Sequence, residues 1–340
     1  MSIDWNKFCQ VIRAADDVVL TSHIRPDCDA LGSELGMADV LREMGKRVRI
    51  VNGQATPPNL KFIDTRQEIM VIGEGITAEQ MADAQLVIIL DTSAWAQLAP
   101  MRPFLESTTA KKIILDHHVS QDDLGAIAFK NTAAEATGRL VVEAADHLGV
   151  PLSTNAASAL FAALATDTGW FRFGSTTQAT YQLAARLVDA GASPARIYGD
   201  LYEHESVGRV RLRGFVLSRV VTELDGRFVY THILKEDFTN SGALPSDTED
   251  LINQALEING TLFAVIMIEQ ATGGFKISFR SRCALSCNDV AARFGGGGHK
   301  AAAGAFIKGN YESVSSQVLS HVRQQLEENL VPNAPHSVTG

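Results

Sequence analysis

Three apolar runs that each end in a carboxylate or an imidazole place the strongest constraint on the fold of this 340-residue chain. The runs and the polar residues that follow them are 18–22 with His23, Asp27 and Asp29; 86–90 with Asp91; and 113–115 with Asp116, His117 and His118. Continuous apolar runs of this length are typical of strands that are buried on both faces of a parallel sheet. The carboxyl ends of such strands lie side by side, so we expect these polar side chains to meet in one crevice.

Strands that alternate with helices up to about residue 190 predict an α/β domain with a mainly parallel sheet and flanking helices. The pattern changes after about residue 195. A helical, Arg-rich stretch over 196–220 precedes shorter strand-like runs, and the runs on either side of Gly273 and Gly274 predict a hairpin. We therefore expect a smaller α+β domain there, with a cleft between the two domains. The expected divisions are a first domain over 1–190, a connector or hinge over 191–215, a second domain over 216–331 and a disordered tail over 332–340.

The net charge and the hydropathy pattern indicate which kinds of binding partner and which cellular location to expect. A net charge of −9 argues against long nucleic acid, whose binding by counterion release needs a basic surface. A short anionic substrate stays compatible with that charge, because a bound metal can supply positive charge locally. No apolar stretch of signal-peptide length precedes the first strand, and no run approaches the roughly 18 residues that span a bilayer. We expect a cytoplasmic protein that has no membrane partner.

The predicted crevice is rich in groups that bind metals, namely His23, Asp27, Asp29, Asp91, Asp116, His117 and Asp167. So many carboxylates cannot stay ionised together without a cation to offset their repulsion. Oxygen ligands with one or two imidazoles favour Mn²⁺ over Mg²⁺, which rarely binds His. Four carboxylates can hold two ions with one acid bridging, an arrangement that stabilises displacement at phosphorus. Structural alternatives stay open for two residues: Asp29 as a helix N-cap, and Asp167 because it follows a helix rather than a strand.

A run of four glycines, 295–298, is followed by His299 and Lys300 in the second predicted domain. Consecutive glycines expose backbone N–H groups to an anion, and both following side chains can donate to phosphate. A flexible linker is the alternative, but apolar, helix-like sequence on both sides of the run argues against it. Arg280, at the end of a predicted strand, suits phosphate recognition, with a solvated surface arginine as its alternative.

These motifs, in this order, resemble those of the DHH phosphoesterase family, which is named for the triplet found here at 116–118. The match covers nearly the whole chain. His23, Asp27 and Asp29 resemble the first motif, Asp91 the second, the triplet the third and Asp167 the fourth. The glycine run with His299 resembles the signature of the DHH-associated C-terminal domain. In length and layout the chain is most similar to the NrnA-type enzymes, which degrade very short RNA and remove the 3′-phosphate of 3′-phosphoadenosine 5′-phosphate (pAp).

The resemblance implies two divalent cations, Mn²⁺ ahead of Mg²⁺ or Co²⁺. One would be bound by His23, Asp27 and Asp91, and the other by Asp29, Asp91, His117 and Asp167. The implied catalytic residues are Asp91, which bridges, His118, which contacts the scissile phosphate, and Asp116, which orients the histidines. The implied substrate-binding residues of the second domain are Arg280, Ser281, Gly296, Gly297, Gly298, His299 and Lys300. Gly138 departs from a Glu-bearing pattern expected after Thr137, which leaves open what this segment contributes to the pocket.

The implied function is that of a metal-dependent phosphoesterase. It would hydrolyse short oligoribonucleotides as a 3′–5′ or 5′–3′ exonuclease, the 3′-phosphate of pAp, or both. The nearest alternative is hydrolysis of linear or cyclic dinucleotides. Further alternatives are a RecJ-like exonuclease, an inorganic pyrophosphatase and a non-catalytic nucleotide-binding regulator. The implied partners are short single-stranded RNA or a mono- or dinucleotide, with a homodimer as an alternative to a monomer.

Overall fold

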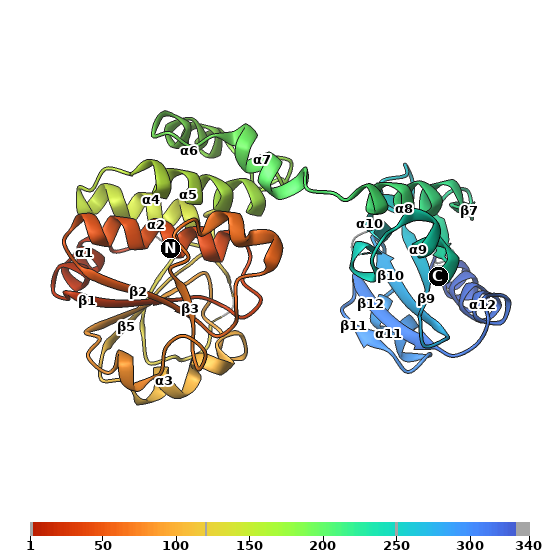
Figure 1. Ribbon diagram of the computed structural model, residues 1–340, viewed down its shortest axis with the longest axis horizontal. Helices are drawn as coiled ribbons and strands as arrows, with labels where there is room; N and C mark the ends of the chain where they lie inside the picture. Colours follow the sequence, from red (N-terminus) through yellow and green to blue (C-terminus); the bar gives the residue numbers. More distant parts are fainter. Residues whose placement is uncertain (1–2, 120, 249–250, 331–340) are drawn as a thin grey trace, which may run out of the picture. The chain divides into compact units, whose positions relative to one another are not determined.

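The computed structural model describes residues 3–119, 121–248 and 251–330. The chain forms two compact units that divide between His204 and Glu205 (Figure 1). Each unit has its own six-stranded sheet and its own hydrophobic core. Within the described ranges, every helix is too short or too polar to cross a lipid bilayer. The predicted tail at 332–340 lies outside these ranges.

The sheet of the first unit is parallel throughout, in the order β3-β2-β1-β4-β5-β6. Its strands are β1 (Asp17–Thr21), β2 (Arg47–Asn52), β3 (Ile69–Val71), β4 (Leu86–Leu90), β5 (Lys111–Asp116) and β6 (Ile127–Lys130). Strands β1 and β4 are buried over their whole lengths. Burial on both faces explains why their sequences are continuous apolar runs, and the predicted parallel α/β fold is confirmed.

Helices cover both faces of this sheet. The helices of the first unit are α1 (Trp5–Arg13), α2 (Cys28–Glu43), α3 (Arg102–Ser107), α4 (Thr137–Leu148), α5 (Thr154–Asp167), α6 (Gln178–Asp189) and α7 (Pro194–Tyr202). Helices α1, α2, α4 and α5 share one hydrophobic core with the sheet, and α3 belongs to the core of the opposite face (Figure 1).

Helices α2 and α5 pack closely because two glycines of α2 face α5. A Cβ atom at Gly32 would lie 2.3 Å from the carbonyl oxygen of Ala159, and one at Gly36 would lie 2.6 Å from the side chain of Leu160. Larger residues at these positions would push the helices apart. The close packing matters for the site, because it holds the C-terminal end of α5, with Asp167, near the first turn of α2, with Asp29.

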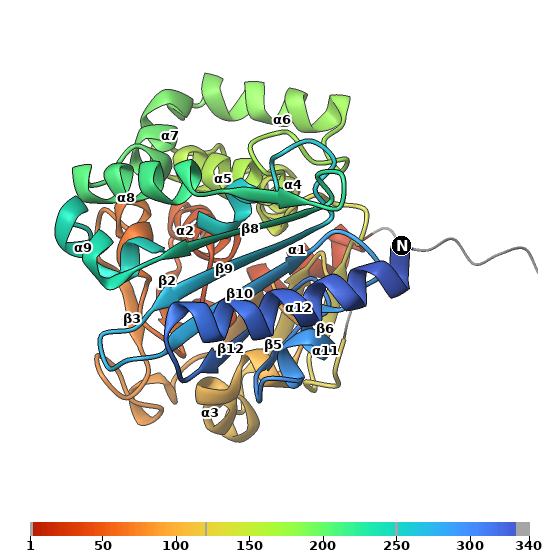
Figure 2. The same ribbon diagram turned by 90° about the vertical axis from the view of Figure 1, so that its right-hand side faces the viewer.

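The second unit is the α+β domain that the sequence predicts. Its strands are β7 (Val221–Glu223), β8 (Phe228–Ile233), β9 (Phe263–Glu269), β10 (Phe275–Ser281), β11 (Gly297–Gly298) and β12 (Ala302–Ile307). The sheet order is β11-β12-β10-β9-β8-β7, and every neighbouring pair is antiparallel except β8–β9. The helices are α8 (Val207–Ser218), α9 (Lys235–Ser241), α10 (Leu251–Ala255), α11 (Cys287–Ala292) and α12 (Tyr311–Leu330). Figure 2 shows α12 lying across the strands of this unit.

Two local expectations differ from the structure. The stretch 196–220 is not one helical segment, because α7 ends at Tyr202 and α8 begins at Val207, where the Ser206 side chain accepts from the backbone as N-cap. The sequence after the glycine run forms β12 rather than a helix. Ala303 and Ala305 alternate into the core there, and this two-residue period is satisfied by a strand.

Candidate metal centre

The polar residues that follow the apolar strands meet at the carboxyl edge of the first-unit sheet. Donor atoms lie within 4.8 Å of one another in three sets: His23, Asp27 and Asp91; Asp29, His117 and Asp167; and Asp91, His117 and His118. The structure therefore brings together all six residues that the resemblance implies as ligands. They follow β1, β4 and β5, begin α2 or end α5. Asp167 lies within the cluster although it ends a helix.

Asp91 stands at the centre of the cluster. Its side-chain Oδ2 lies 3.4 Å from Nε2 of His23, and its Oδ1 lies 3.6 Å from Nε2 of His117. Oδ1 also accepts a hydrogen bond of 2.9 Å from the hydroxyl of Thr137. The two oxygens thus face two different donor sets, which is the arrangement of a bridging carboxylate. The backbone of Asp91 is left-handed, with φ of 61°, a conformation that costs about 1–3 kcal/mol and is common at functional sites.

Two histidines present the same nitrogen to the carboxylates. Nδ1 of His23 donates to the carbonyl of Ile24 at 2.9 Å, and Nδ1 of His117 donates to the carbonyl of Ala134 at 3.1 Å. A carbonyl can only accept, so the proton is on Nδ1 in both rings. Nε2 then faces the acids, and for His117 it lies 3.5 Å from Asp167. Imidazoles held in this way are ready to bind a metal through Nε2.

The pKa values of the clustered side chains indicate whether the site would bind cations. Burial raises the pKa of Asp29 well above its usual range, and the charges of Asp91 and Asp167 raise it further. Burial also raises the pKa of Asp167, to about 6. For His23, burial by itself would lower the pKa, but Asp91 and the carbonyl of Ile24 raise it to about 9. The cluster therefore favours added positive charge, and its oxygen and imidazole donors fit divalent cations.

The two aspartates at the start of α2 have different roles. Asp27 is the N-cap, and its Oδ1 accepts from the backbone N–H groups of Asp29 at 3.0 Å and Ala30 at 3.1 Å. Asp29 is only 2% exposed, and it accepts from the backbone N–H groups of Thr137 at 2.7 Å and Gly138 at 2.9 Å. The N-cap alternative for Asp29 is therefore wrong. Its carboxylate is held instead by the first turn of α4, whose free N–H groups favour a negative charge.

The first residues of α4 hold two carboxylates of the cluster in place, a role that the sequence does not reveal. Thr137 contacts both Asp29, through its N–H, and Asp91, through its hydroxyl. At Gly138 a Cβ atom would lie 2.8 Å from Cβ of Ala163 on α5, so glycine allows the helices to come this close. The sequence shows a threonine followed by a glycine at the start of a predicted helix. It does not show which carboxylates these two residues contact.

Comparison with known proteins agrees with this geometry. Residues 17–164 match the DHH family, N-terminal domain, and residues 225–328 match the DHHA1 domain. The bifunctional oligoribonuclease and PAP phosphatase NrnA of Thermus thermophilus is 30% identical over 330 residues, which is 95% of each chain. The chain belongs to the DHH family. The NrnA of Bacillus subtilis is 28% identical to this DHH chain over 302 residues, or 88% of this chain and 91% of that protein. Among solved structures, an exopolyphosphatase-related protein from Bacteroides fragilis is 28% identical with a TM-score of 0.80, and the match covers 95% of both chains.

Within the DHH triplet, the fully buried Asp116 orients only one of the two histidines. Its Oδ1 accepts from both Nδ1 and the backbone N–H of His118, each at 2.9 Å. Its Oδ2 accepts from the hydroxyl of Ser93 at 2.8 Å and lies 3.0 Å from Nζ of Lys130. Burial would raise the pKa of Asp116, but hydrogen bonds from His118, Ser93 and Lys130 lower it to about 2. The expectation that Asp116 orients both histidines needs correction, since the Nδ1 atom of His117 donates to a backbone carbonyl instead.

In the DHHA1 region, Arg280 and Ser281 lie on opposite faces of β10. Ser281 is 9% exposed, and its hydroxyl donates to the carbonyl of Leu285 at 2.7 Å. The Arg280 guanidinium contacts the side chain of Asn253 at 3.2 Å and the carbonyl of Phe279 at 3.0 Å. Neighbouring strand residues alternate between faces, so these two side chains cannot share one pocket. The structure therefore argues against Ser281 as a substrate-binding partner of Arg280.

The glycine run is built differently from the expected cradle of free N–H groups. The N–H groups of Gly295 and Gly296 donate to carbonyls of α11, and that of Gly298 donates to the Asn288 side chain at 3.0 Å. A Cβ atom at Gly296 would lie 2.1 Å from the carbonyl oxygen of Gly304. These glycines therefore allow close backbone packing. His299 and Lys300 follow on an exposed turn, so both remain accessible to a ligand.

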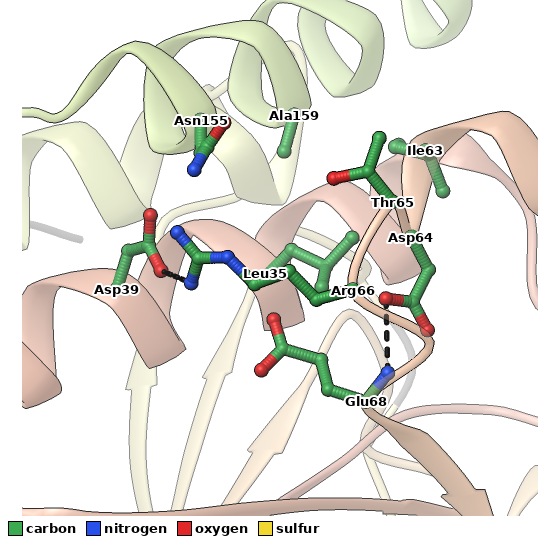
Figure 3. Close-up of a pocket in the computed structure, with 9 residues that line it drawn as sticks. All are labelled: Leu35, Asp39, Ile63, Asp64, Thr65, Arg66, Glu68, Asn155 and Ala159. Atoms are coloured by element: carbon green, nitrogen blue, oxygen red, sulfur yellow. Dashed lines mark hydrogen bonds and ion pairs between the residues drawn. The ribbon is translucent and has the colours of Figure 1, made fainter.

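A small pocket elsewhere in the first unit is structural. It lies between α2, the loop at 64–68 and the start of α5, and the Arg66 guanidinium closes it by an ion pair of 2.7 Å with Asp39 (Figure 3). Asp39 lies ten residues beyond Asp29 on α2, which is about 15 Å along the helix. This pocket is therefore separate from the metal-binding cluster.

Proposed function

We propose that this DHH chain is a phosphoesterase that hydrolyses short oligoribonucleotides and the 3′-phosphate of pAp. The names of the NrnA relatives support this proposal, because the matches cover nearly the full length of both chains. The observation that carries it is Asp91, whose two oxygens face two separate sets of acids and imidazoles. A site of this kind suits hydrolysis of a phosphoester, because two cations would stabilise the negative charge on the phosphate oxygens.

Two divalent cations would bind here, one at His23, Asp27 and Asp91 and the other at Asp29, Asp91, His117 and Asp167. Mn²⁺ is our proposal, because each set includes an imidazole. When bound, the ions would supply Lewis-acid stabilisation of the phosphate and activation of water.

The chain's own residues complete the proposed chemistry. Asp116 accepts from Nδ1 of His118 and raises the pKa of its ring, so a protonated His118 would also donate from Nε2 to a phosphate oxygen. The His118 side chain is 48% exposed. In the second unit, Arg280, His299 and Lys300 would bind the substrate's other phosphate or its nucleotide. In this proposal the first unit carries out the hydrolysis and the second unit binds the substrate. We propose that this arrangement determines the length of RNA that is accepted.

One assay panel tests the proposal. Purified protein with added Mn²⁺ is given a dinucleotide, a pentaribonucleotide, pAp, a cyclic dinucleotide and pyrophosphate, and release of nucleotide and of phosphate is measured separately. We expect nucleotide release from the RNAs and phosphate release from pAp. Hydrolysis of the cyclic dinucleotide alone would favour the dinucleotide alternative, and hydrolysis of pyrophosphate alone would contradict the proposal.

Lys130→Met should lower kcat by about tenfold to a hundredfold, the range typical of residues that orient a site group. The reason is that Lys130 binds both Asp116, at 3.0 Å, and Ser93, at 2.6 Å, and thereby fixes the carboxylate that orients His118. The substrate KM and the metal-induced rise in unfolding temperature should stay unchanged, and Lys130→Arg should restore part of kcat. A loss of metal binding in Lys130→Met would contradict a role limited to positioning.

Arg280→Ala should raise KM for nucleotide substrates by about tenfold or more while kcat changes little. A hydrogen bond to a charged group contributes about 1.5–3 kcal/mol, and Arg280 lies far from the metal-binding residues in sequence, in the other unit. Steady-state kinetics with pAp and a dinucleotide measure both constants. An unchanged KM for every nucleotide tested would show that Arg280 does not bind substrate.

A further inference from the structure

One face of the second-unit sheet is only partly covered. Helices α11 and α12 pack on one face, and α8 and α10 cover β8 and β9 on the other. Toward β10 and β12, the side chains of this second face become accessible. Lys276 on β10 is exposed, and the Phe306 side chain on β12 is 48% exposed, which is unusual for a large aromatic residue on a sheet.

Strand register shows which residues share this face. Across β10 and β12, Lys276 pairs with Phe306, Ser278 with Gly304, and Arg280 with Ala302. Gly304 pairs in turn with Gly297 of the glycine run. Directly paired side chains lie about 5 Å apart, and the four-residue step from Lys276 to Arg280 covers about 13 Å. Lys276 and Arg280 therefore lie at the two ends of a stretch whose middle positions, Ser278, Gly304 and Gly297, are small.

The chemistry of this face suits single-stranded RNA. Lys276 and Arg280 are too far apart to bind two oxygens of one phosphate, so they would bind two different phosphates of one strand. A hollow of about 190 Å³ lies beside these two side chains. Among the residues that the structure describes, its lining carries no carboxylate and consists of Thr248, Ile252, Ile266, Ile268, Lys276, Ser278 and Arg280. The small residues let a sugar–phosphate chain approach the backbone, and an exposed aromatic ring stacks on a base of any sequence.

We propose that Lys276 and Phe306 form a second nucleotide subsite beside Arg280, in which Lys276 binds a phosphate and Phe306 stacks on the adjacent base. The subsite rests on the proposed function, because it requires a nucleotide substrate. It acts only on substrates longer than a mononucleotide, since one nucleotide cannot reach both Arg280 and the Lys276–Phe306 pair. It therefore selects for RNA length and leaves pAp hydrolysis unaffected.

Binding of labelled RNA to the full-length protein in chelator tests the subsite without cleavage. Phe306→Ala should weaken binding of a pentaribonucleotide about tenfold, the effect of losing one base stack, and Phe306→Trp should preserve or strengthen it. Lys276→Ala should weaken binding and reduce the salt dependence by about 0.7 in slope, as expected for one lost phosphate contact on a single strand. Lys235→Ala, an exposed lysine at the start of α9, is the matched control and should change nothing.

The kinetics of pAp hydrolysis separate the subsite from the proposed function. All of these variants should retain the wild-type KM and kcat for pAp, which also shows that they fold. Pentaribonucleotide affinity that is unchanged in the Lys276→Ala, Phe306→Ala double variant would overturn the subsite, as would an equal loss for pAp. If the wild-type protein hydrolyses neither RNA nor pAp, the proposed function itself fails, and the subsite fails with it.

Discussion

Replacement of Asp91 by asparagine will lower phosphoester hydrolysis by at least about a thousandfold, which corresponds to about 4 kcal/mol of transition-state stabilisation. The physical reason is that both oxygens of Asp91 serve the cluster, one toward His23 and the other toward His117. An asparagine keeps one oxygen but loses the negative charge and the second acceptor. Both proposed cations are then bound more weakly, and kcat falls for every substrate.

The variant is designed so that loss of activity cannot be attributed to unfolding. Asparagine tolerates the left-handed backbone of position 91 and can still accept from the Thr137 hydroxyl. Removing one carboxylate also relieves the repulsion that raises the pKa of Asp29. This relief offsets the lost contact with His23, so the metal-free variant should fold like the metal-free wild type. Asp39→Asn, which changes a buried carboxylate of α2 outside the cluster, is the matched control and should keep kcat within about threefold. Wild-type activity in Asp91→Asn would refute the bridging role.

Removal of divalent cations will abolish activity and lower the unfolding temperature of the first unit, and adding Mn²⁺ will restore both. Binding to the folded state alone contributes about 2.7 kcal/mol at a hundred times Kd. For a unit of this size, spanning Met1–His204, that corresponds to a rise of about 5–10 °C. Differential scanning calorimetry after chelation and metal addition measures the shift independently of activity.

Two comparisons make this prediction specific. The metal-induced rise in unfolding temperature should nearly disappear in Asp91→Asn and persist in Asp39→Asn. The reason is that Asp91 belongs to the donor sets and Asp39 does not. Mn²⁺ should act at a lower concentration than Mg²⁺, since His23 and His117 present Nε2 to the site and imidazole nitrogen binds Mg²⁺ poorly. An equal rise in Asp91→Asn would place the cation elsewhere, and equal potency of the two metals would contradict the Mn²⁺ proposal.

Much of the first unit can be predicted from local sequence. The apolar runs at β1 and β4 indicate buried parallel strands, and the rule that their carboxyl ends adjoin places His23, Asp91 and Asp116 at one edge. The residue types alone then indicate a cation site, because acids with imidazoles need positive charge. Family membership follows from the same motifs, and the comparisons confirm it.

Other features depend on contacts that no local pattern encodes. The carboxylate of Asp29 is held by backbone N–H groups of Thr137 and Gly138, residues 108 and 109 positions away. Lys130 reaches Asp116 only because β5 and β6 pair in the register that sets these two residues opposite each other. A sequence shows that such groups exist, but the packing of helices and strands decides which of them meet.

In the second unit, too, some features can be predicted from the sequence and others depend on the folded structure. The sequence by itself determined the kind of chemistry available there, with its glycine run, Arg280 and His299. Only the folded sheet decided that Gly297 shares a face with Arg280, Lys276 and Phe306 while Ser281 points into the core. The reason is that strand residues alternate between faces, so a shift of one residue in register would exchange the buried and accessible sets.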